Sequence, residues 1–595
     1  MKKRIFSASP FILGLATLFP HFSNAQAGSG SESIHLNQIG FYPSGPKMAI
    51  VVGSKATKFS LISAANQKDT VFAGALVNGG TWEPSDEQTS KADFSTFSKS
   101  GSYIVHVNGL GNSFPFDILP NVNEEVAKAS LKAYYFQRTA IELTPEFAGK
   151  YARAAGHPDD KVIVHPSAAF GKRTAGSIIK SSKGWYDAGD YNKYIVNSGI
   201  STYTLLALYE DFKLYSDGLK LNIPESKNQL PDLIDEINWN LRWMITMQDP
   251  EDGGVYHKLT NPNFDGSVQP KDATAPRYVV KKSTAAALDF AAVMAQASRI
   301  YKDFAKQMPG FSDSCLAASK KAYAWAKKNP TVYYIQSELT DPVVVTGAYD
   351  DMNVKDEFFW AASELFIATG DVTYFKDAQV EASLAENVKI PDWQSVGMLG
   401  VYTLASNASK FPANKEVTAE LTLAKTKFVE AAKSLKTKAF TSAYGVPMGT
   451  EMSDFVWGSN AVAGNQGVFL LKAYLLSQDK SLVDAAEANA DYLLGRNATG
   501  YSFLTGFGEK SPKNPHHRPS ESDGIAEPVP GLLAGGPNPG QQDLPHCNGK
   551  TYPSAKAGLS YMDVQCSYAS NEIAINWNAP FAYIVNALEA IKKTK

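Results

Sequence analysis

Two aspartates in the run from Gly184 to Tyr194 are the first candidates for chemistry in this chain. Asp187 and Asp190 are separated only by Ala188 and Gly189, and aromatic residues stand on both sides. The small residues permit a tight backbone path that can aim both carboxylates into one space. Two close carboxylates can hold a water molecule and remove its proton. The alternative interpretation is a solvated acidic turn, or an aspartate that caps a helix.

A glutamate near the end of the chain, Glu572, stands among apolar and aromatic residues such as Ile573 and Trp577. Such a setting raises the pKa of a carboxyl group, which then keeps a proton for donation. Ser570 or Asn571 can cap a helix that begins here, and Glu572 would then lie in its first turn. A capping carboxylate is therefore the alternative to a general acid.

The segment 497–560 is rich in Gly, Pro and His and contains His516, His517 and Arg518. A histidine and an arginine together offer donors to sugar hydroxyls or to a carboxylate. A metal shared by the two histidines is the competing interpretation, but adjacent side chains point apart in an extended chain. A segment of this length without regular structure is usually functional or disordered.

Composition narrows the class of protein. The chain has 595 residues, of which 44% are hydrophobic and 19% charged, so it can form a large core. Its formal net charge of −2 argues against nucleic acid as a partner, because phosphate binding needs a concentrated basic surface. The 28 tyrosines and 9 tryptophans fit either a large core or rings that stack on sugars.

The N-terminus has the features of a signal peptide. Lys2, Lys3 and Arg4 precede the short apolar run 11–19, and small residues suited to cleavage follow near Ala25. The run is too short to span a bilayer. Residues 1–25 are therefore predicted to be removed, which leaves a secreted protein, extracellular or periplasmic, with no membrane anchor.

Three cysteines occur in the chain. An exported context permits disulfides, and Cys547 and Cys566, close together in a Gly/Pro-rich segment, are the candidate pair. Cys315 lies in a helical stretch and is expected to be a buried thiol.

Hydrophobic patterning divides the chain in two. Residues 31–119 contain short β-prone runs, among them 48–52 and 102–107, separated by Gly, Pro, Asn and Ser, which predicts a small sandwich. From residue 123 to 595 the pattern is helical, and many helices joined by long loops predict an α/α barrel. The predicted helical runs are 231–248, 283–303, 315–328, 356–369, 415–436, 464–476, 481–494 and 569–592.

Three separate motifs, in this order, resemble those of family-nine glycoside hydrolases. Residues 36–41 are similar to the opening of that family's N-terminal immunoglobulin-like domain. Residues 502–518 resemble its histidine signature, and residues 561–579 resemble the signature that bears its acid. The resemblance covers nearly the whole mature chain. It implies an inverting cellulase with an immunoglobulin-like β-sandwich followed by an all-α (α/α)6 barrel.

The resemblance also assigns roles to individual residues. Asp190 matches the general base, Asp187 the carboxylate that helps to hold the water, and Glu572 the general acid. Asp563, His516 and Arg518 match active-site residues that contact sugar and support the acid. The residues that resemble sugar contacts or stacking platforms are His257, Trp393, Trp457 and Trp577, although each tryptophan can instead be core.

Zinc is not expected, and no organic cofactor is needed. Many relatives with this N-terminal domain bind a structural zinc with two cysteines and two histidines. Here Thr139, Gly156 and Tyr186 stand at or beside the positions of three ligands, and only His157 remains. One ligand cannot form a four-coordinate zinc site.

A structural calcium is the metal that the resemblance makes plausible. Thr346, Gly347, Asp356 and Glu357 offer the hard oxygens that calcium prefers. Gln394 and Ser395 stand where relatives often carry an aspartate, which weakens the predicted site. The alternative is that these acids cap helices.

The sequence thus predicts a secreted, monomeric endo-β-1,4-glucanase whose partner is a β-glucan. Two alternatives stay open. The first is an exo-acting hydrolase of cello-oligosaccharides or glucosamine oligomers. The second is a non-catalytic glucan-binding protein, against which the joint presence of Asp187, Asp190 and Glu572 argues.

Overall fold

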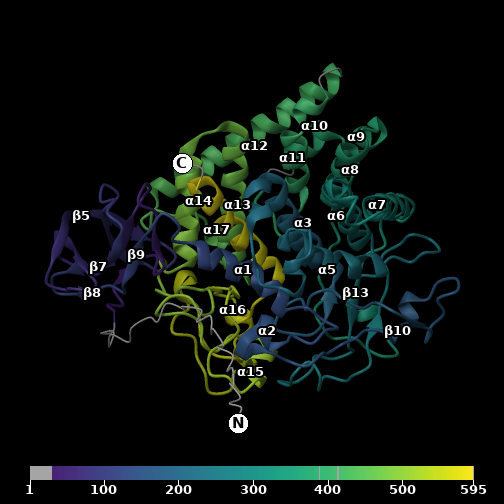
Figure 1. Cartoon of the computed structure of the whole chain (residues 1–595), viewed down its shortest axis with the longest axis horizontal. Helices are drawn as coiled ribbons and strands as arrows, with labels where there is room; N and C mark the ends of the chain where they lie inside the picture. Colours follow the sequence, from purple (N-terminus) through teal and green to yellow (C-terminus); the bar gives the residue numbers. More distant parts are fainter. Residues whose placement is uncertain (1–29, 387–388, 412–413, 594–595) are drawn as a thin grey trace, which may run out of the picture.

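A computed structural model describes residues 30–386, 389–411 and 414–593. The predicted signal peptide, residues 1–25, lies outside them. A β-rich N-terminal part precedes a mostly helical part, as the sequence predicts. Figure 1 shows the β-rich part as a separate body at one end of the molecule, with the helices filling the rest.

Nine strands form the N-terminal part, in the order β1-β3-β6-β5-β4-β7-β9-β2 with β8 beside β7. The long strand β5 joins two layers, because its first half pairs with β4 and its second half with β6. Alternating apolar side chains from both layers, such as Val51 of β3 and Leu61 of β4, meet in one core. The strands are β1 (Ile34–His35), β2 (Gly40–Phe41), β3 (Met48–Val52), β4 (Lys58–Ser63), β5 (Thr70–Trp82), β6 (Glu87–Asp93), β7 (Gly101–Val107), β8 (Gly111–Asn112) and β9 (Phe116–Ile118).

Buried helices of the second part contact one another in a closed ring. Each packs against the next, and the last packs against the first. In ring order they are α3 (Ile195–Asp211), α6 (Thr284–Tyr301), α8 (Lys355–Thr369), α11 (Gly397–Ser406), α13 (Ser459–Ser477) and α17 (Ile575–Lys593). The helices packed outside the ring include α1 (Glu124–Phe136), α5 (Asp232–Thr246), α7 (Phe311–Lys328), α9 (Val372–Ala378), α10 (Val380–Glu386), α12 (Lys415–Thr441) and α14 (Lys480–Leu493).

Seven of the eight predicted helical runs are present with shifted ends, and the eighth, 569–592, is divided into α16 and α17 by an extended segment at Glu572. The prediction missed α3 and α11 of the ring, and the short outer helices α9 and α10. In α3 every residue from Ile195 to Tyr209 is buried, and α11 is buried over nearly its whole length. A helix that is covered on all sides needs no polar face, so it lacks the 3.6-residue periodicity that reveals a surface helix.

The site is built from loops at one end of the helices. A small sheet, in the order β11-β10-β14-β13-β12, lies before α3 and α6. Its strands are β10 (Val162–Val164), β11 (Ile178–Ile179), β12 (Lys193–Tyr194), β13 (Lys258–Thr260) and β14 (Tyr278–Val279). Two short helices, α15 (Arg518–Ser522) and α16 (Tyr568–Asn571), lie toward the lower edge of Figure 1 among these loops.

The segment 497–560 is mostly irregular in the structure, and a disulfide joins its Cys547 to Cys566, which lies just beyond the segment. This is the pair that the sequence indicates. Cys315 is a buried free thiol in α7, as expected. Among the described residues, no helix is both long enough and apolar enough to cross a membrane.

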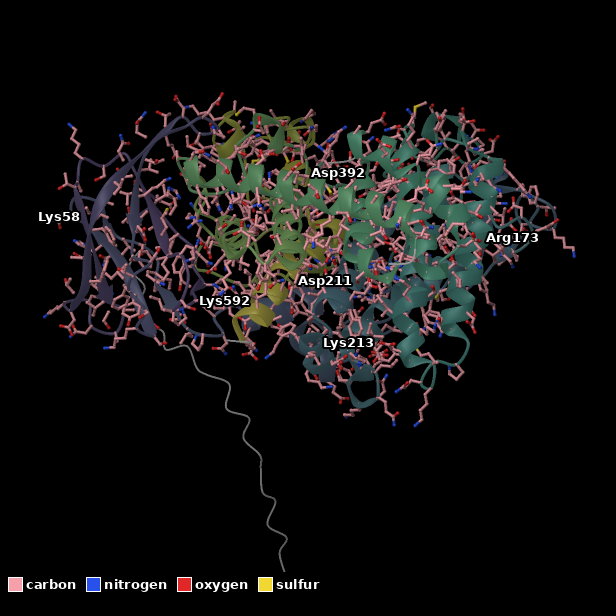
Figure 2. The ribbon with its side chains drawn as sticks, turned by 90° about the horizontal axis from the view of Figure 1, so that it is seen from above. Lys58, Arg173, Asp211, Lys213, Asp392 and Lys592 are labelled. Carbon is pink, nitrogen blue, oxygen red and sulfur yellow. A yellow bond between two sulfur atoms is a disulfide. The ribbon has the colours of Figure 1, made fainter. Side chains whose placement is uncertain are left out.

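The β-rich part is joined to the helices by a buried apolar contact framed by hydrogen bonds. The ring of Trp82 packs 4.4 Å from that of Tyr444 and also against Phe455. The Asn37 amide donates to Asp491, and Tyr42 Oη donates to Glu589, each at 2.8 Å. In Figure 2, Lys592 lies at this junction, where its Nζ donates to the Ser44 carbonyl at 3.1 Å.

A chain that begins at Pro120 is expected to fold poorly without changing its chemistry. Deletion exposes Tyr444 and Phe455 and removes one hydrogen-bond donor from each of the buried acids Asp491 and Glu589. Contacts between domains of one chain commonly bury about 600–1,500 Å². We expect low yield and early thermal inactivation, measured against the full chain, while the folded fraction keeps the product pattern and product anomer. A well-folded truncated protein with a different cleavage pattern would show that the sandwich reaches the substrate.

Candidate active site

The loop that carries the two aspartates is bound from three directions. It begins at Trp185, which bridges to Arg138, and it ends in β12, directly before α3. The backbone amide of Asp187 donates to the Asn192 carbonyl at 3.0 Å, which closes the loop. The Asp187 carbonyl accepts from the amide of Ile575, the first residue of α17, at 2.8 Å. A backbone hydrogen bond therefore joins the aspartate loop to the segment that carries Glu572.

Asp187 and Asp190 differ in how their oxygens are used. Both oxygens of Asp187 are bound, one by Asn197 at 2.6 Å and the other by Tyr349 Oη at 2.7 Å. In Asp190, Oδ2 accepts from Asn192 at 2.7 Å and from Tyr194 Oη at 2.9 Å. Asp190 Oδ1 is buried and has no hydrogen-bond partner among the described residues. Asp190 is thus the carboxylate with an oxygen available for a proton.

Burial and the neighbouring Asp190 charge raise the pKa of Asp187 to about 8, against the opposing hydrogen bonds from Asn197 and Tyr349. Asp187 is only 2% exposed, so burial is the largest cause. At neutral pH Asp187 therefore favours its protonated, uncharged form.

Glu572 does not lie in a helix, contrary to the sequence prediction. It follows the last residue of α16 in extended conformation and precedes α17. Its carbonyl accepts from Gly535 N at 2.8 Å, and its backbone pairs in parallel with that of His516. These contacts with distant loops hold the segment straight, which helix-cap signals in the sequence cannot indicate.

The carboxyl group of Glu572 lies at the aspartate loop and is set to keep its proton. Gly189 N donates to Glu572 Oε1 at 3.3 Å. Burial, followed by the negative charge of Asp190, raises the pKa of Glu572 well above its usual range, and Arg518 opposes this in part. The structure thus brings together the three carboxyl groups that the sequence singles out.

Arg518 and His516 both contact the aspartate loop at Gly189. Arg518 Nη1 donates to the Gly189 carbonyl at 2.8 Å. A Cβ at Gly189 would lie 2.2 Å from the His516 carbonyl oxygen and 3.0 Å from its ring, so only glycine permits this approach. The Nδ1 atom of His516 is bound to the Gln565 carbonyl at 2.8 Å. Burial, with the charge of Arg518, lowers the pKa of His516 to about 4, so its ring is neutral at pH 7.

Asp563 binds backbone rather than facing the aspartates. Its oxygens accept from the amides of Lys513 and Asn514 at 2.8 and 2.9 Å, and from the Asn571 side chain at 3.0 Å. Asp563 therefore joins the histidine loop, residues 502–518, to Asn571, the residue before Glu572. It can act on the acid only through these segments.

His257 is not placed as a sugar contact, which corrects the sequence assignment. The residue is 1% exposed and stacks on Tyr334 at 3.9 Å. Both ring nitrogens are used within the protein, Nδ1 by Ser283 Oγ at 2.8 Å and Nε2 by the Ala348 carbonyl at 2.7 Å. The side chain therefore holds the loop before Tyr349 instead of offering a free nitrogen to a ligand.

The three tryptophans fall in different settings. Trp457 is 42% exposed and lies 5.3 Å from the ring of Tyr568, which in turn lies 6.0 Å from His516. Trp393 is partly buried and packs edge-on to Tyr349 at 5.3 Å. Trp577 is 8% exposed and fills the space beside Gly458 and Gly535. It therefore packs against these two loops and offers no free ring face to a sugar.

The four residues predicted to hold calcium do not form one site. Lys258 Nζ donates to Thr346 Oγ1 at 3.0 Å and to the Gly347 carbonyl at 2.7 Å, so a lysine ammonium already occupies these oxygens. Asp356 and Glu357 lie in the first turn of α8, and both Glu357 oxygens are buried without a partner.

Buried acids gather around Glu357. Burial, followed by the charges of Asp356, Asp289 and Asp351, raises the pKa of Glu357 well above its usual range. Both Asp289 oxygens also lack partners. As they stand, no three His, Cys, Asp or Glu side chains in the described parts of the chain are placed to hold a metal ion. The acidic half of the predicted set fits calcium in chemistry, and the Thr346 and Gly347 half does not.

Two of the residues at the family's zinc positions, His157 and Tyr186, lie in a hydrogen-bonded aromatic group. His157 Nδ1 is bound to Tyr186 Oη at 2.7 Å, and the rings of His157, Tyr186 and Tyr191 lie against one another. Thr139 Oγ1 donates to the Lys183 carbonyl.

The sequence interpretation missed the residues that orient the aspartates, namely Asn192, Tyr194, Asn197 and Tyr349. Asn192 and Tyr194 lie in the same run as the aspartates, so hydroxyl and amide donors directly after a carboxylate pair were a usable signal. Tyr349 lies 162 positions from Asp187, and no local pattern connects them.

Asp187→Asn is expected to flatten part of the pH dependence of stability. The folded-state pKa of Asp187, about 8, lies above its ordinary value of 3.8. A raised pKa contributes stability that is fully present below pH 4 and is lost as the pH rises through about 8. Denaturant unfolding at pH 5, 7 and 9 measures the free energy of unfolding of wild type and variant. Contributions from the other titrating groups cancel in the difference between the two proteins. Parallel profiles would contradict the raised pKa.

Comparisons with known proteins identify the family of each part of the chain. The model described as Glycosyl hydrolase family 9 matches residues 124–585, and the model described as Cellulase N-terminal ig-like domain matches residues 29–112. The xyloglucan-specific endo-beta-1,4-glucanase of Bacteroides ovatus is 46% identical over 566 residues, which is 94% of this chain and 94% of that protein. Endoglucanase D of Acetivibrio thermocellus is 32% identical over 98% of this chain and 86% of its own length.

A solved structure titled as a family-nine hydrolase of Bacteroides ovatus superimposes with a TM-score of 0.87 at 44% identity, over 94% of this chain and 99% of that one. The aspartate loop, the extended Glu572 and the histidine loop thus occur in a chain whose two parts each match a family model. The chain belongs to glycosyl hydrolase family 9.

Proposed function

We propose that this protein hydrolyses β-1,4-glucosidic bonds within glucan chains by a single displacement that inverts the anomeric carbon. The observation that carries the proposal is the meeting of two unlike carboxyl groups at Gly189. Asp190 offers a buried oxygen without a partner, and Glu572 has a pKa well above its usual range. One is suited to take a proton and the other to give one.

In the proposed step, Asp190 removes a proton from a water molecule as its oxygen attacks the anomeric carbon. Glu572 gives its proton to the glycosidic oxygen as the carbon–oxygen bond breaks. The products are a new reducing end of opposite configuration and a free hydroxyl on the leaving sugar. Asp190 is then protonated and Glu572 ionised, and exchange with solvent restores both. Asp187 helps to hold the attacking water, in the role that the family resemblance gives it.

A xyloglucan backbone is the first substrate to test, because the relative that is 46% identical over 94% of both chains is named for it. Trp457 and the adjacent Tyr568 offer an exposed aromatic surface that suits a sugar ring. An exo-acting hydrolase of cello-oligosaccharides or glucosamine oligomers is the competing function within the same site, and a non-catalytic binding protein is the competing class.

Product analysis decides among these functions. The full chain is incubated with xyloglucan, mixed-linkage glucan, cello-oligosaccharides and glucosamine oligomers, and the products are followed by proton NMR and by chain length. We expect α-configured reducing ends first and a rapid fall in polymer length. β-configured first products would refute inversion, release from chain ends only would refute endo action, and binding without turnover would refute catalysis.

We further propose that the closed ring of helices and its outer layer form an (α/α)6 barrel, in domain 123–595, with a sandwich domain at 31–119. The alternation of inner and outer helices supports this. The signal-peptide features of residues 1–25 support export. We propose that the secreted protein acts as a monomer, which light scattering of the purified full chain tests directly.

Calcium binding is proposed for Asp356 and Glu357, with Asp289 and Asp351 beside them. Buried carboxylate oxygens without partners support it, because calcium prefers several hard oxygens. Removal of calcium by EGTA is expected to lower the melting temperature by several degrees, because a bound ligand stabilises the folded state. A zinc-specific chelator serves as the control and is expected to change nothing. No EGTA effect, together with no calcium in the purified protein by mass spectrometry, would refute the site.

A further inference from the structure

The side chain of Lys258 is buried completely and ends among neutral oxygens. Its Nζ lies 2.8 Å from Gln336 Oε1, 3.3 Å from the Thr346 carbonyl, 3.0 Å from Thr346 Oγ1 and 2.7 Å from the Gly347 carbonyl. In the described residues, no carboxylate lies within 4.0 Å of it. A buried ammonium without a counter-ion is costly, so its environment must compensate through hydrogen bonds.

The acceptors around Lys258 favour the charged form. Gln336, Thr346 and Gly347 each present a carbonyl oxygen, which can only accept, and an ammonium group has three protons and no lone pair. Tyr194 and Tyr334 place their rings 5.6 and 5.3 Å from Nζ, within the range of cation–π attraction. Burial lowers the pKa of Lys258 to about 7, and the charges of Asp190 and Asp350 act in the opposite direction.

The oxygens around Lys258 belong to a segment that reaches the reacting groups. Lys258 binds Thr346 and Gly347, His257 binds the Ala348 carbonyl, and Tyr349 donates to Asp187. Lys258, the first residue of β13, and His257 directly before it therefore hold three successive residues of the segment that leads to Tyr349.

The same strand also touches the other aspartate. Lys258 is paired with Tyr194 across β12 and β13. Tyr194 Oη donates to Asp190 at 2.9 Å. Two tyrosines orient the aspartate pair: Tyr349 binds Asp187 and Tyr194 binds Asp190. Lys258 contacts the segment that carries the first and is the strand partner of the second.

We infer that Lys258 is a positioning residue for the hydrolysis, an internal cation that holds segment 346–349 so that Tyr349 stays hydrogen-bonded to Asp187. It binds oxygens of this loop as a metal ion would, but it is covalently part of the chain. The inference rests on the proposed function, because it assigns Lys258 a task within that site. Lys258 touches neither sugar nor water in this role and acts through Tyr349.

Kinetics of Lys258→Met test the inference. Methionine is one atom shorter than lysine and fills most of the same space, but it has no charge or donor. We expect kcat on a cello-oligosaccharide to fall about 10- to 100-fold, the scale of a small displacement in an active site, with KM changed less than about twofold. Assays run well below the unfolding temperature, with the folded fraction measured by circular dichroism.

The matched control is Lys281→Met. Lys281 lies near the surface, and its Nζ binds Glu338 at 2.8 Å. It therefore contacts the same 336–338 turn but lies outside the cage, the set of oxygens from Gln336, Thr346 and Gly347 that surrounds the Lys258 ammonium. Its kcat is expected to match wild type. An equal loss in both variants, or a folded Lys258→Met with wild-type kcat, would overturn the inference.

A double-mutant cycle with Tyr349→Phe separates positioning from a merely structural role. If Lys258 acts through Tyr349, the double variant loses no more kcat than the worse single variant, whereas multiplied losses would overturn the inference. Should Lys258→Met fail to fold, Gln336→Leu removes one acceptor from the partly buried side of the cage. It is expected to lower kcat several-fold at constant KM, and an unchanged kcat would count against the cage. A wild-type protein without turnover on any glucan would instead refute the proposed function.

Discussion

Glu572→Gln is expected to lower turnover of an unsubstituted β-1,4-glucan by at least about 10²-fold while binding is retained. An amide has nearly the shape of the carboxyl group but gives no proton to the leaving oxygen, and general acid help is worth about 10²- to 10⁴-fold. Gly189 N, which donates to Oε1, can donate equally well to the amide oxygen. Initial rates and binding of a cello-oligosaccharide measure the two parts separately.

The leaving group sharpens this test. A substrate that releases a dinitrophenolate needs no proton, so the variant is expected to hydrolyse it with a much smaller loss. We also expect the wild-type rate on a natural glucan to fall at alkaline pH as Glu572 ionises, and this fall to disappear with the dinitrophenyl substrate. Glu509→Gln, an exposed carboxylate in the histidine loop, is the matched control. Near-wild-type turnover of a natural glucan by Glu572→Gln would remove Glu572 from the mechanism.

Asp190→Asn is the second large loss that we expect, again about 10²- to 10⁴-fold in kcat with little change in KM. The asparagine oxygen can keep the hydrogen bonds from Asn192 and Tyr194, which hold Oδ2 in wild type. Its amide group would then stand where Oδ1 has no partner, and an amide does not accept the proton of the attacking water. Unlike Glu572→Gln, this variant is expected to lose activity equally on substrates with good and poor leaving groups.

The control for Asp190→Asn is Asp160→Asn, which removes an exposed carboxylate in the same part of the chain. Comparison with Asp187→Asn is equally informative. Both oxygens of Asp187 are bound by protein, so its loss is expected to slow the reaction less. A larger loss in Asp187→Asn than in Asp190→Asn would transfer the role of base to Asp187.

Local sequence was sufficient to find the carboxyl groups but not the conformation of each. Asp187 and Asp190 lie in one short loop among small and aromatic residues, so their closeness follows from covalent connection. Glu572 was predicted to lie in the first turn of a helix, because Ser570 and Asn571 are good caps. The structure has it extended, since its backbone pairs with His516 and Gly535, which are distant in sequence.

The metal and sugar assignments show the same limit. Thr346 and Gly347 have the oxygens that calcium prefers, but Lys258, 88 positions earlier, already binds the Thr346 hydroxyl. His257 has a histidine's usual donors and acceptors, but Ser283 and Ala348 use both nitrogens. A residue type states what a side chain can bind, and only its neighbours decide whether that capacity is free.

By itself, the sequence determined the order of a β-rich and a helical part, most helix positions, the disulfide pair and the three carboxyl groups. These depend on periodicity, composition and spacing within short segments. The tertiary structure alone decided which carboxylate keeps a free oxygen, which one is driven to hold a proton, and which cation fills the loop at Thr346. The physical reason is that desolvation and hydrogen-bond pairing depend on side chains brought together from distant segments, as Tyr349 is to Asp187 and Lys258 to Gly347.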